Sequence, residues 1–233
     1  MAGIIDDSVG LTAGQDPIPA LASTGSDHLE VEVKFLVDSL EVLRRRLAGS
    51  GAQLIAPRIH EQNVRFDTPS ESLLRKWQLL RLRQDSRVRL TFKAPVAEDQ
   101  HSEAKIREEI EVTIDDFDKM ATILERLGFQ PVQMYEKFRE TYHWDNVEIV
   151  LDETPFGDFV ELEGSESAIR AVASGLGLDW SRRILANYLA LMELARQTFD
   201  LPFHDLTFVN FERHPVSMTG LLPVCLLSET EEW

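Results

Sequence analysis

The stretch HLEVEVKF, residues 28–35, decides the fold because its polar and apolar side chains alternate without a break. Successive side chains of a β-strand point to opposite faces, so Glu30, Glu32 and Lys34 share one face and the four apolar residues share the other. The same period recurs in KIREEIEVTI, residues 105–114. The pattern predicts a sheet with one apolar face and one charged face.

The composition is that of an ordinary globular chain, since 43% of the 233 residues are hydrophobic and 27% are charged. A single cysteine, Cys225, excludes an internal disulfide framework and suits a reducing compartment. The N-terminus has no basic segment followed by an apolar core, and the longest apolar run, 221–227, is short and contains Pro223. We therefore expect a cytoplasmic protein without a secretory signal or a membrane span. The formal net charge of −16 argues against a nucleic-acid binder, which needs a basic surface.

The patterning divides the chain into three segments. Residues 1–27 are rich in Gly, Pro, Ser, Ala and Asp without a period, which predicts a flexible N-terminal lead. Residues 28–200 hold the regular patterns and predict one folded domain. Residues 201–233 predict a C-terminal extension that is partly disordered and loosely attached after Glu212.

Within the domain, alternating stretches predict strands, and apolar residues three and four positions apart predict helices. The predicted strands are 28–36, 61–67, 78–84, 86–94, 105–114, 135–144, 147–152 and 157–163. The predicted helices are 38–51, 115–129, 166–175 and 181–198. Closely spaced strands with few long crossovers favour an antiparallel sheet with helices packed outside it.

The charges on the polar face are segregated by sign. The first and last strands carry mainly Glu, whereas the middle strands carry Arg and Lys, as in the pair Arg81 and Arg83. A one-sided sheet with its charged face in water is the plain interpretation. About eight strands can instead close into a barrel that holds side chains or one small ligand. Charges inside such a barrel must be hydrated, paired with one another or compensated by a ligand. A divalent cation bound to a polyphosphate satisfies both signs, so a charged tunnel that holds such a complex accounts for both sets of residues.

On these residues the chain resembles the CYTH superfamily, the triphosphate tunnel metalloenzymes, which include class IV adenylate cyclases and thiamine triphosphatases. The family's Glu-x-Glu-x-Lys signature is here Glu30-Val-Glu32-Val-Lys34. The likeness continues in order through Arg81-Leu-Arg83, Thr91-Phe-Lys93, SEAKIREEIEV, EKFRETY and LDETPFGDFVELE. It covers about residues 28–200 and is greatest to the class IV adenylate cyclase-like branch.

The resemblance implies an α+β fold in which an eight-stranded antiparallel β-barrel forms a tunnel with helices packed outside it. It also implies a role for each set of charged residues in that tunnel. It implies that Mg²⁺ or Mn²⁺ is held by acidic side chains, namely Glu30, Glu32, Glu161 and Glu163, with Asp152 as a further candidate. It implies that the phosphates are bound by Lys34, Arg81, Arg83, Lys93, Lys105, Arg107, Lys137 and Arg139.

The roles of four charged residues leave alternatives open. Asp152 ends a strand and could instead begin the turn DETPFG. Glu109 and Glu111 are expected inside the tunnel, paired with basic residues rather than with metal. Lys34 either assists deprotonation of the nucleophile, if neighbouring cations lower its pKa, or only binds phosphate.

The resemblance implies a metal-dependent enzyme that acts on a triphosphate, first of all a class IV adenylate cyclase that converts ATP to cyclic AMP and pyrophosphate. An inorganic triphosphatase or thiamine triphosphatase is the alternative, because both reactions need the same clamp on the phosphates. A sensor that binds polyphosphate or a nucleotide without turnover is a third interpretation, and a purely structural protein would leave the charged face without a purpose. The expected partner is a small triphosphate (ATP, tripolyphosphate or thiamine triphosphate), and the oligomeric state is left open, a homodimer included.

Overall fold

The computed structural model describes residues 29–96 and 102–220, so the expected lead, 1–27, and the end of the expected extension, 221–233, lie outside the described residues. The strands are β1 (Leu29–Val37), β2 (Gln53–Asp67), β3 (Leu79–Gln84), β4 (Val88–Pro95), β5 (Lys105–Ile114), β6 (Gln130–Trp144), β7 (Val147–Thr154) and β8 (Gly157–Glu163). The α-helices are α1 (Leu40–Ser50), α2 (Phe117–Arg126), α3 (Glu166–Gly175), α4 (Tyr188–Phe199) and α5 (Phe208–Arg213). The short 3₁₀ helices are η1 (Leu74–Lys76), η2 (Trp180–Arg182) and η3 (Met218–Gly220).

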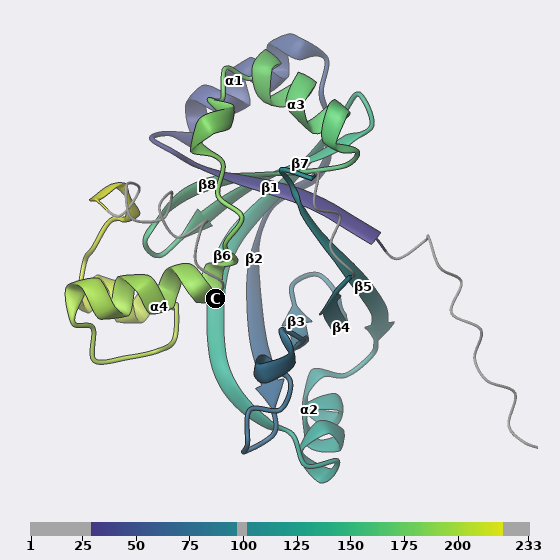
Figure 1. Ribbon diagram of the computed structural model, residues 1–233, viewed down its shortest axis with the longest axis vertical. Coiled ribbons are helices and arrows are strands. Elements are labelled where there is room, and N and C mark those ends of the chain that lie inside the picture. The colour runs from purple at the N-terminus through teal and green to yellow at the C-terminus, as the bar shows by residue number, and fades with distance from the viewer. Residues whose placement is uncertain (1–28, 97–101, 221–233) are drawn as a thin grey trace, which may run out of the picture.

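The eight strands form a closed barrel in the order β1-β5-β4-β3-β2-β6-β7-β8, and β8 pairs again with β1 (Figure 1). Each neighbouring pair is antiparallel. Closure pairs every strand on both sides, and charged side chains of β1 and of β3 to β8 face the interior of the ring. The predicted α+β class with an eight-stranded antiparallel tunnel and outer helices is confirmed.

Helices α1 and α3 cover the outer face of β1, β7 and β8 (Figure 1). Leu43 and Leu47 of α1 and Ile169 of α3 are buried against the apolar side chains of these strands, such as Phe35. The leucines lie on one side of α1 because positions three and four residues apart share a helix face. Helix α1 ends at Gly51, whose φ of 87° is a left-handed conformation that glycine adopts without steric cost.

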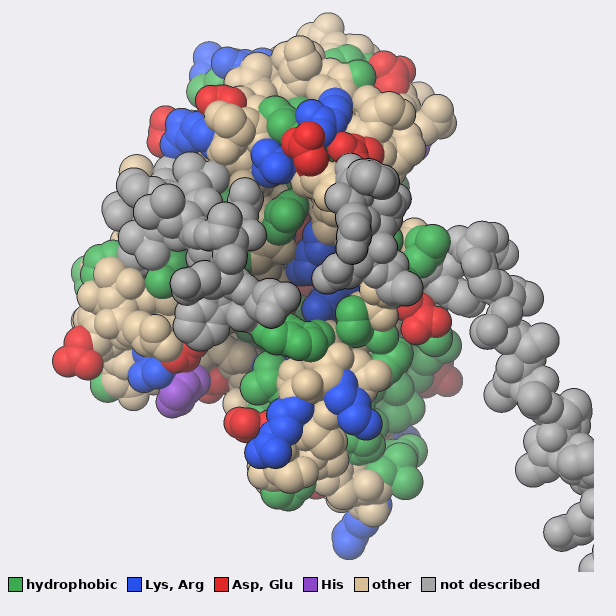
Figure 2. All heavy atoms as spheres, in the orientation of Figure 1, with side chains coloured by type: hydrophobic (Ala, Val, Ile, Leu, Met, Phe, Trp, Pro, Cys, Tyr) green, Lys and Arg blue, Asp and Glu red, His purple; other side chains and the backbone are tan. Residues whose placement is uncertain are grey.

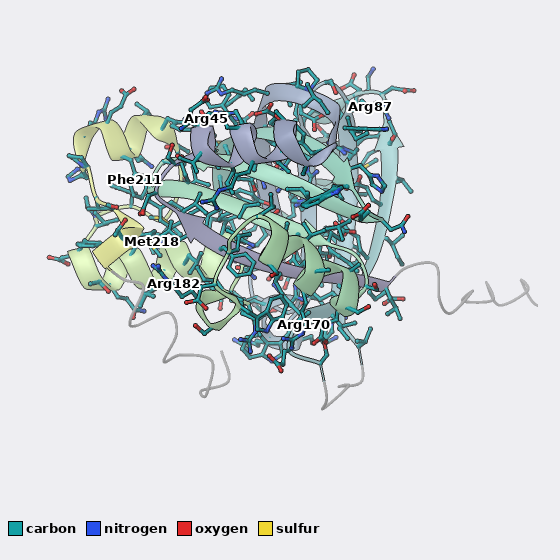
Figure 3. The ribbon with its side chains drawn as sticks, turned by 90° about the horizontal axis from the view of Figure 1, so that it is seen from above. Arg45, Arg87, Arg170, Arg182, Phe211 and Met218 are labelled. Atoms are coloured by element: carbon teal, nitrogen blue, oxygen red, sulfur yellow. The ribbon has the colours of Figure 1, made fainter. Side chains whose placement is uncertain are left out.

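Two further clusters complete the outer layer. Helix α2 places Leu124 against Phe66 of β2 and Leu82 of β3. Helix α4 packs with Phe159 of β8 and with residues of the C-terminal segment, such as Phe211. Figure 3 shows the C-terminal segment at the end of the molecule away from the β3–β4 turn, which carries Arg87. Among the described residues, no helix is both long enough and apolar enough to cross a membrane.

The first half of β2 was not predicted: the strand begins at Gln53, whereas the sequence pattern predicted a start at residue 61. Residues 53–60 pair with β6 only, and the register shifts between Ala56 and Ile59, where Pro57 lies. A proline in a strand is tolerated at such irregularities because it cannot donate a ladder hydrogen bond. The exposed fractions of Leu54 and Ile55 are 53% and 60%, so this stretch lacks the one-sided burial that produces an alternating sequence.

The predicted helix 181–198 is wrong in its first third. Residues after η2 are extended, and Ile184 pairs with Lys34 of β1 through two backbone hydrogen bonds of 3.2 and 2.7 Å. Helix α4 begins only at Tyr188, where the side chain of Asn187 accepts a hydrogen bond from the amide of Ala190.

The described part of the expected extension is packed on the barrel. Leu206 pairs in parallel with Tyr135 of β6, and its amide donates to the carbonyl of Met134 at 3.0 Å. Beyond Glu212, Met218 is 2% exposed and its amide donates to the carbonyl of Phe156 at 3.0 Å, whereas loose attachment of the extension as a whole stays a prediction.

Candidate active site

A cavity of about 350 Å³ lies inside the ring of strands. Nine of its lining residues are Lys or Arg and seven are Glu, and they come from every strand except β2. All of the residues expected to bind phosphate line this cavity, and so do all of the expected metal ligands except Asp152. Figure 2 shows basic side chains within a hollow at the centre of this face of the molecule. The polar residues that alternate along the strands in the sequence therefore line one charged tunnel in the structure.

The strand register brings the expected acidic residues together. Glu163 of β8 lies in register with Glu32 of β1 on one side and with Glu148 of β7 on the other. Burial, Glu30 and Glu148 raise the pKa of Glu163 to about 8. Burial and Glu32 raise the pKa of Glu30 to about 7, although Lys93 opposes this shift. Crowded carboxylates repel one another, which is the situation that a bound cation relieves.

The acidic side chains fit a hard divalent cation by their chemistry, because Mg²⁺ and Mn²⁺ prefer carboxylate oxygens. As they stand, no three His, Cys, Asp or Glu side chains in the described parts of the chain converge on one metal position. Glu161 is instead paired with Lys34 at 2.6 Å and with Arg139 at 2.5 Å, and Glu30 is paired with Lys93. A metal at this end would replace lysine as the partner of these oxygens.

Asp152 is fully buried and its carboxylate accepts four hydrogen bonds. The donors are Lys137 at 2.9 Å, Arg139 at 2.8 and 2.7 Å, and the hydroxyl of Tyr188 at 2.8 Å. A carboxylate has about four lone-pair sites, so these donors account for its full capacity. In this structure Asp152 is a counter-ion of the basic residues, and its role as a metal ligand stays a prediction.

Lys34 lies deep in the tunnel, with its ammonium 4.6 Å from the ring centre of Tyr188. Burial opposes its charge, but Glu161 and Glu32 outweigh burial and raise its pKa. These carboxylates raise the pKa of Lys34 rather than lower it, and its role as a base stays a prediction. Burial, Arg107, Lys34 and Lys93 do lower the pKa of Lys105 to about 8, although Glu32 opposes this shift.

The expectation that Glu109 and Glu111 pair with basic residues inside the tunnel is confirmed. Glu109 lies 2.9 Å from Lys93, and Glu111 lies 3.5 Å from Arg89. Arg81 is within 3.7 Å of both carboxylates. These pairs keep the cations of the middle strands ordered without removing them from the tunnel wall.

Sequence reasoning missed two residues at the buried end, Glu61 and Tyr188. Glu61 is 0% exposed and is surrounded by Arg83, Lys137 and Arg139. Burial opposes its ionisation, yet these three cations hold its pKa well below the usual value. Its alternation with Asn63 in the predicted strand 61–67 was the available signal. Tyr188 reaches the tunnel from the start of α4, and a helix pattern gives no sign of that.

The comparisons with known proteins agree with this geometry. The CYTH domain family model matches residues 28–180. A Methanocaldococcus jannaschii protein named "Putative adenylate cyclase" is 33% identical over 143 residues, which are 60% of this chain and 79% of that protein. A solved structure of a protein of the same name from Vibrio parahaemolyticus superposes with a TM-score of 0.61 at 21% identity, over 70% of this chain and 97% of that one.

A more distant solved structure is that of a Hippeastrum protein described as a putative adenylyl cyclase with a dominant triphosphatase activity. It superposes with a TM-score of 0.52 at 18% identity, over 72% of this chain and 96% of that one, which is a likeness of fold. The family model covers well over half of the chain, and the tunnel that it implies is present. The chain therefore belongs to the CYTH domain family.

Proposed function

We propose that the protein is a cytoplasmic, metal-dependent enzyme that acts on a triphosphate, with ATP as the first candidate substrate and cyclic AMP and pyrophosphate as the products. CYTH domain proteins process triphosphates. The observation that carries the proposal is the tunnel itself, in which nine Lys or Arg side chains face a cavity of about 350 Å³. A buried row of cations is costly unless an anion or internal carboxylates compensate it.

The chain's own residues would bind and orient the phosphates. Arg81 and Arg83 present guanidinium groups, which match phosphate oxygens in a bidentate manner, and Lys34 presents a compact charge. Arg81 is anchored by Thr91 and by the hydroxyl of Tyr135, so its head is oriented before the substrate arrives. Such pre-set donors stabilise the charge that develops on phosphate oxygens in phosphoryl transfer.

The metal would be held by the glutamates of the first and last strands, Glu30, Glu32, Glu161 and Glu163. When bound, Mg²⁺ or Mn²⁺ supplies charge neutralisation of the phosphates and lowers the pKa of a coordinated oxygen. In the cyclase reaction the ribose 3′-oxygen attacks the α-phosphorus and pyrophosphate leaves. The tunnel residues hold the leaving phosphates in line, which lowers the entropic cost of the reaction.

Hydrolysis of the terminal phosphate is the second candidate, and a specific observation favours it. The few apolar side chains lining the cavity, among them Leu79, Val150 and Leu189, offer little surface for a nucleobase. The cavity volume is also at the small end of the range of about 300–1,000 Å³ for pockets that bind whole ligands. A tunnel that grips only the phosphate chain suits inorganic tripolyphosphate or thiamine triphosphate as well as ATP. The relative from Hippeastrum is described with such an activity.

The deciding experiment is a product assay with Mg²⁺ or Mn²⁺ and, separately, ATP, tripolyphosphate and thiamine triphosphate, read by chromatography and phosphorus NMR. Cyclic AMP with pyrophosphate would establish the cyclase. Orthophosphate without cyclic AMP would establish the triphosphatase. Turnover of none of the three would refute an enzyme, and calorimetry would then distinguish a sensor, which binds tripolyphosphate, from a protein that does not.

A further inference from the structure

Glu61 is a buried carboxylate among Arg83, Lys137 and Arg139, and no role described above involves it. Its side chain is 1% exposed. Its oxygens lie 3.4 Å from Arg83, 3.5 Å from Lys137 and 3.9 Å from the side chain of Arg139. One negative charge therefore faces three cations that the tunnel is expected to offer to phosphate.

The contacts of Glu61 with these cations are long, unlike those of Asp152. Among the described residues, the one hydrogen bond to the Glu61 carboxylate comes from the amide of Asn63, at 2.9 Å, and Oε2 has no hydrogen-bond partner. The Nε of Arg83 also has no partner in the described part of the chain. Asp152, in contrast, receives four bonds between 2.7 and 2.9 Å. Glu61 thus compensates charge without occupying the hydrogen-bonding groups of Arg83.

The two states of the tunnel give Glu61 opposite effects. In the empty tunnel, Arg83 is 8% exposed and has Arg81 beside it, and burial together with that second guanidinium lowers the pKa of Arg83. The Glu61 carboxylate then stabilises the fold, because unpaired buried cations are costly. Once phosphates occupy the tunnel, the same cations are compensated by the ligand. The Glu61 carboxylate is held in the wall and cannot turn to solvent, so it repels the bound anion.

We infer that Glu61 is an internal counter-anion that keeps the cations of the empty tunnel compatible with folding and weakens the tunnel's hold on a bound oligophosphate. Glu61 is a positioning residue, since it does not line the cavity and acts through Arg83, Lys137 and Arg139. In a catalytic cycle, the negative charge of Glu61 would make a polyanionic product dissociate faster than it would from a tunnel with the same nine Lys or Arg side chains and no such charge. The inference rests on the proposed function in that the ligand is an oligophosphate.

The test is Glu61→Gln, which removes the charge and keeps the shape and an acceptor for the amide of Asn63. Glu153→Gln on the outer face of β7 is the matched control, because it changes the net charge equally and its carboxylate pairs with Arg58 away from the cavity. Calorimetry with tripolyphosphate and with pyrophosphate, in the absence of metal, measures Kd. Removing one repulsive charge within several ångströms of the ligand predicts a Kd about tenfold lower for Glu61→Gln and unchanged for the control.

Thermal unfolding gives the second readout. Glu61→Gln without ligand should unfold at a lower temperature than the wild type, and tripolyphosphate should raise its Tm by more than it raises the wild-type Tm. Glu61→Asp keeps the charge and should restore both the wild-type Kd and most of the stability. If Glu61→Gln does not fold alone, the inference requires that tripolyphosphate restores its fold.

The outcomes separate the inference from the proposed function. An equal or higher Kd in Glu61→Gln, with the wild type binding tripolyphosphate, overturns the inference and leaves the proposed function standing. Failure of tripolyphosphate to restore an unfolded Glu61→Gln variant overturns the inference in the same way. A wild type that binds neither oligophosphate overturns both.

Discussion

Replacing Asp152 by Asn should destabilise the protein far more than the same change at the next residue. Asp152 lies on the inner face of β7 behind the cavity wall, is 0% exposed and accepts bonds from Lys137, Arg139 and Tyr188. Glu153 follows it in the same strand but points outward, where its 28% exposed side chain pairs with Arg44 and Arg58. The two variants, Asp152→Asn and Glu153→Gln, remove one negative charge each from opposite faces of β7.

The expected magnitudes follow from burial. Breaking a buried ion pair by neutralising one partner costs about 3–5 kcal/mol, because the remaining charges are left without compensation. In a chain of this size that corresponds to a fall in Tm of roughly 6–20 °C. The two outer pairs of Glu153 are worth about 1 kcal/mol or less each, so Glu153→Gln should lower the Tm by at most about 8 °C. Asn keeps an acceptor for the hydroxyl of Tyr188, so the lower half of the range is expected for Asp152→Asn.

The assay is thermal unfolding followed by circular dichroism and calorimetry, at low and at high salt. High salt should weaken the outer pair and leave the buried cluster almost unaffected, since buried pairs are poorly screened. A loss of stability in Asp152→Asn no larger than that in Glu153→Gln would refute the assignment of Asp152 as the counter-ion of Lys137 and Arg139. Loss of metal binding by Asp152→Asn with unchanged stability would instead support its predicted role as a metal ligand.

Four further predictions test the tunnel. Arg81→Ala should raise the Kd for tripolyphosphate roughly 10- to 100-fold, because charge-assisted hydrogen bonds contribute about 1.5–3 kcal/mol. The control Arg87→Ala, on the exposed β3–β4 turn (Figure 3), should leave the Kd unchanged. Equal Kd values for the two variants in calorimetry would place Arg81 outside the binding site. Glu161→Ala combined with Glu163→Ala should abolish turnover with Mg²⁺ or Mn²⁺ while circular dichroism shows a retained fold, and full activity would contradict the metal-site assignment. Chelation with EDTA should stop turnover but leave the rise in Tm that tripolyphosphate causes, because the cations bind phosphate without metal; disappearance of that rise would show that binding itself needs the metal. Tyr188→Phe should lower the free energy of unfolding in urea by about 1–3 kcal/mol through the lost bond to Asp152, and no change would show that water replaces the hydroxyl.

The division of faces was available from the sequence because a strand alternates its side chains by geometry alone. Glu30, Glu32 and Lys34 could be assigned to one face from a single stretch, and the segregation of sign among strands indicated a closed, charged interior. The apolar stripes of α1 and α2 likewise required only the helical period. These assignments do not depend on which strand pairs with which, because they follow from the local geometry of one strand or one helix.

Contacts across strands were out of reach, because they depend on register. That Glu163 lies between Glu32 and Glu148 follows from the pairing of β8 with β1 and β7, which no local pattern specifies. The direction of the pKa shift of Lys34 depends in the same way on Glu161, its register partner on the neighbouring strand β8. The sequence could name Lys34 as a charged tunnel residue but could not tell a lowered pKa from a raised one.

The sequence by itself determined the family resemblance, through its ordered motifs, and the charged residues that share one face of each strand, because period-2 alternation is a local property of the chain. Closure of the sheet into a ring depends on strand pairing, which lies beyond that local property. Tertiary structure alone decided which charges compensate one another. It buried Glu61 among three cations, saturated Asp152 with four donors and brought Tyr188 from the start of α4 into the wall of the tunnel. Electrostatic energy depends on distances of a few ångströms between residues far apart in the chain, and those distances exist only after the barrel has closed.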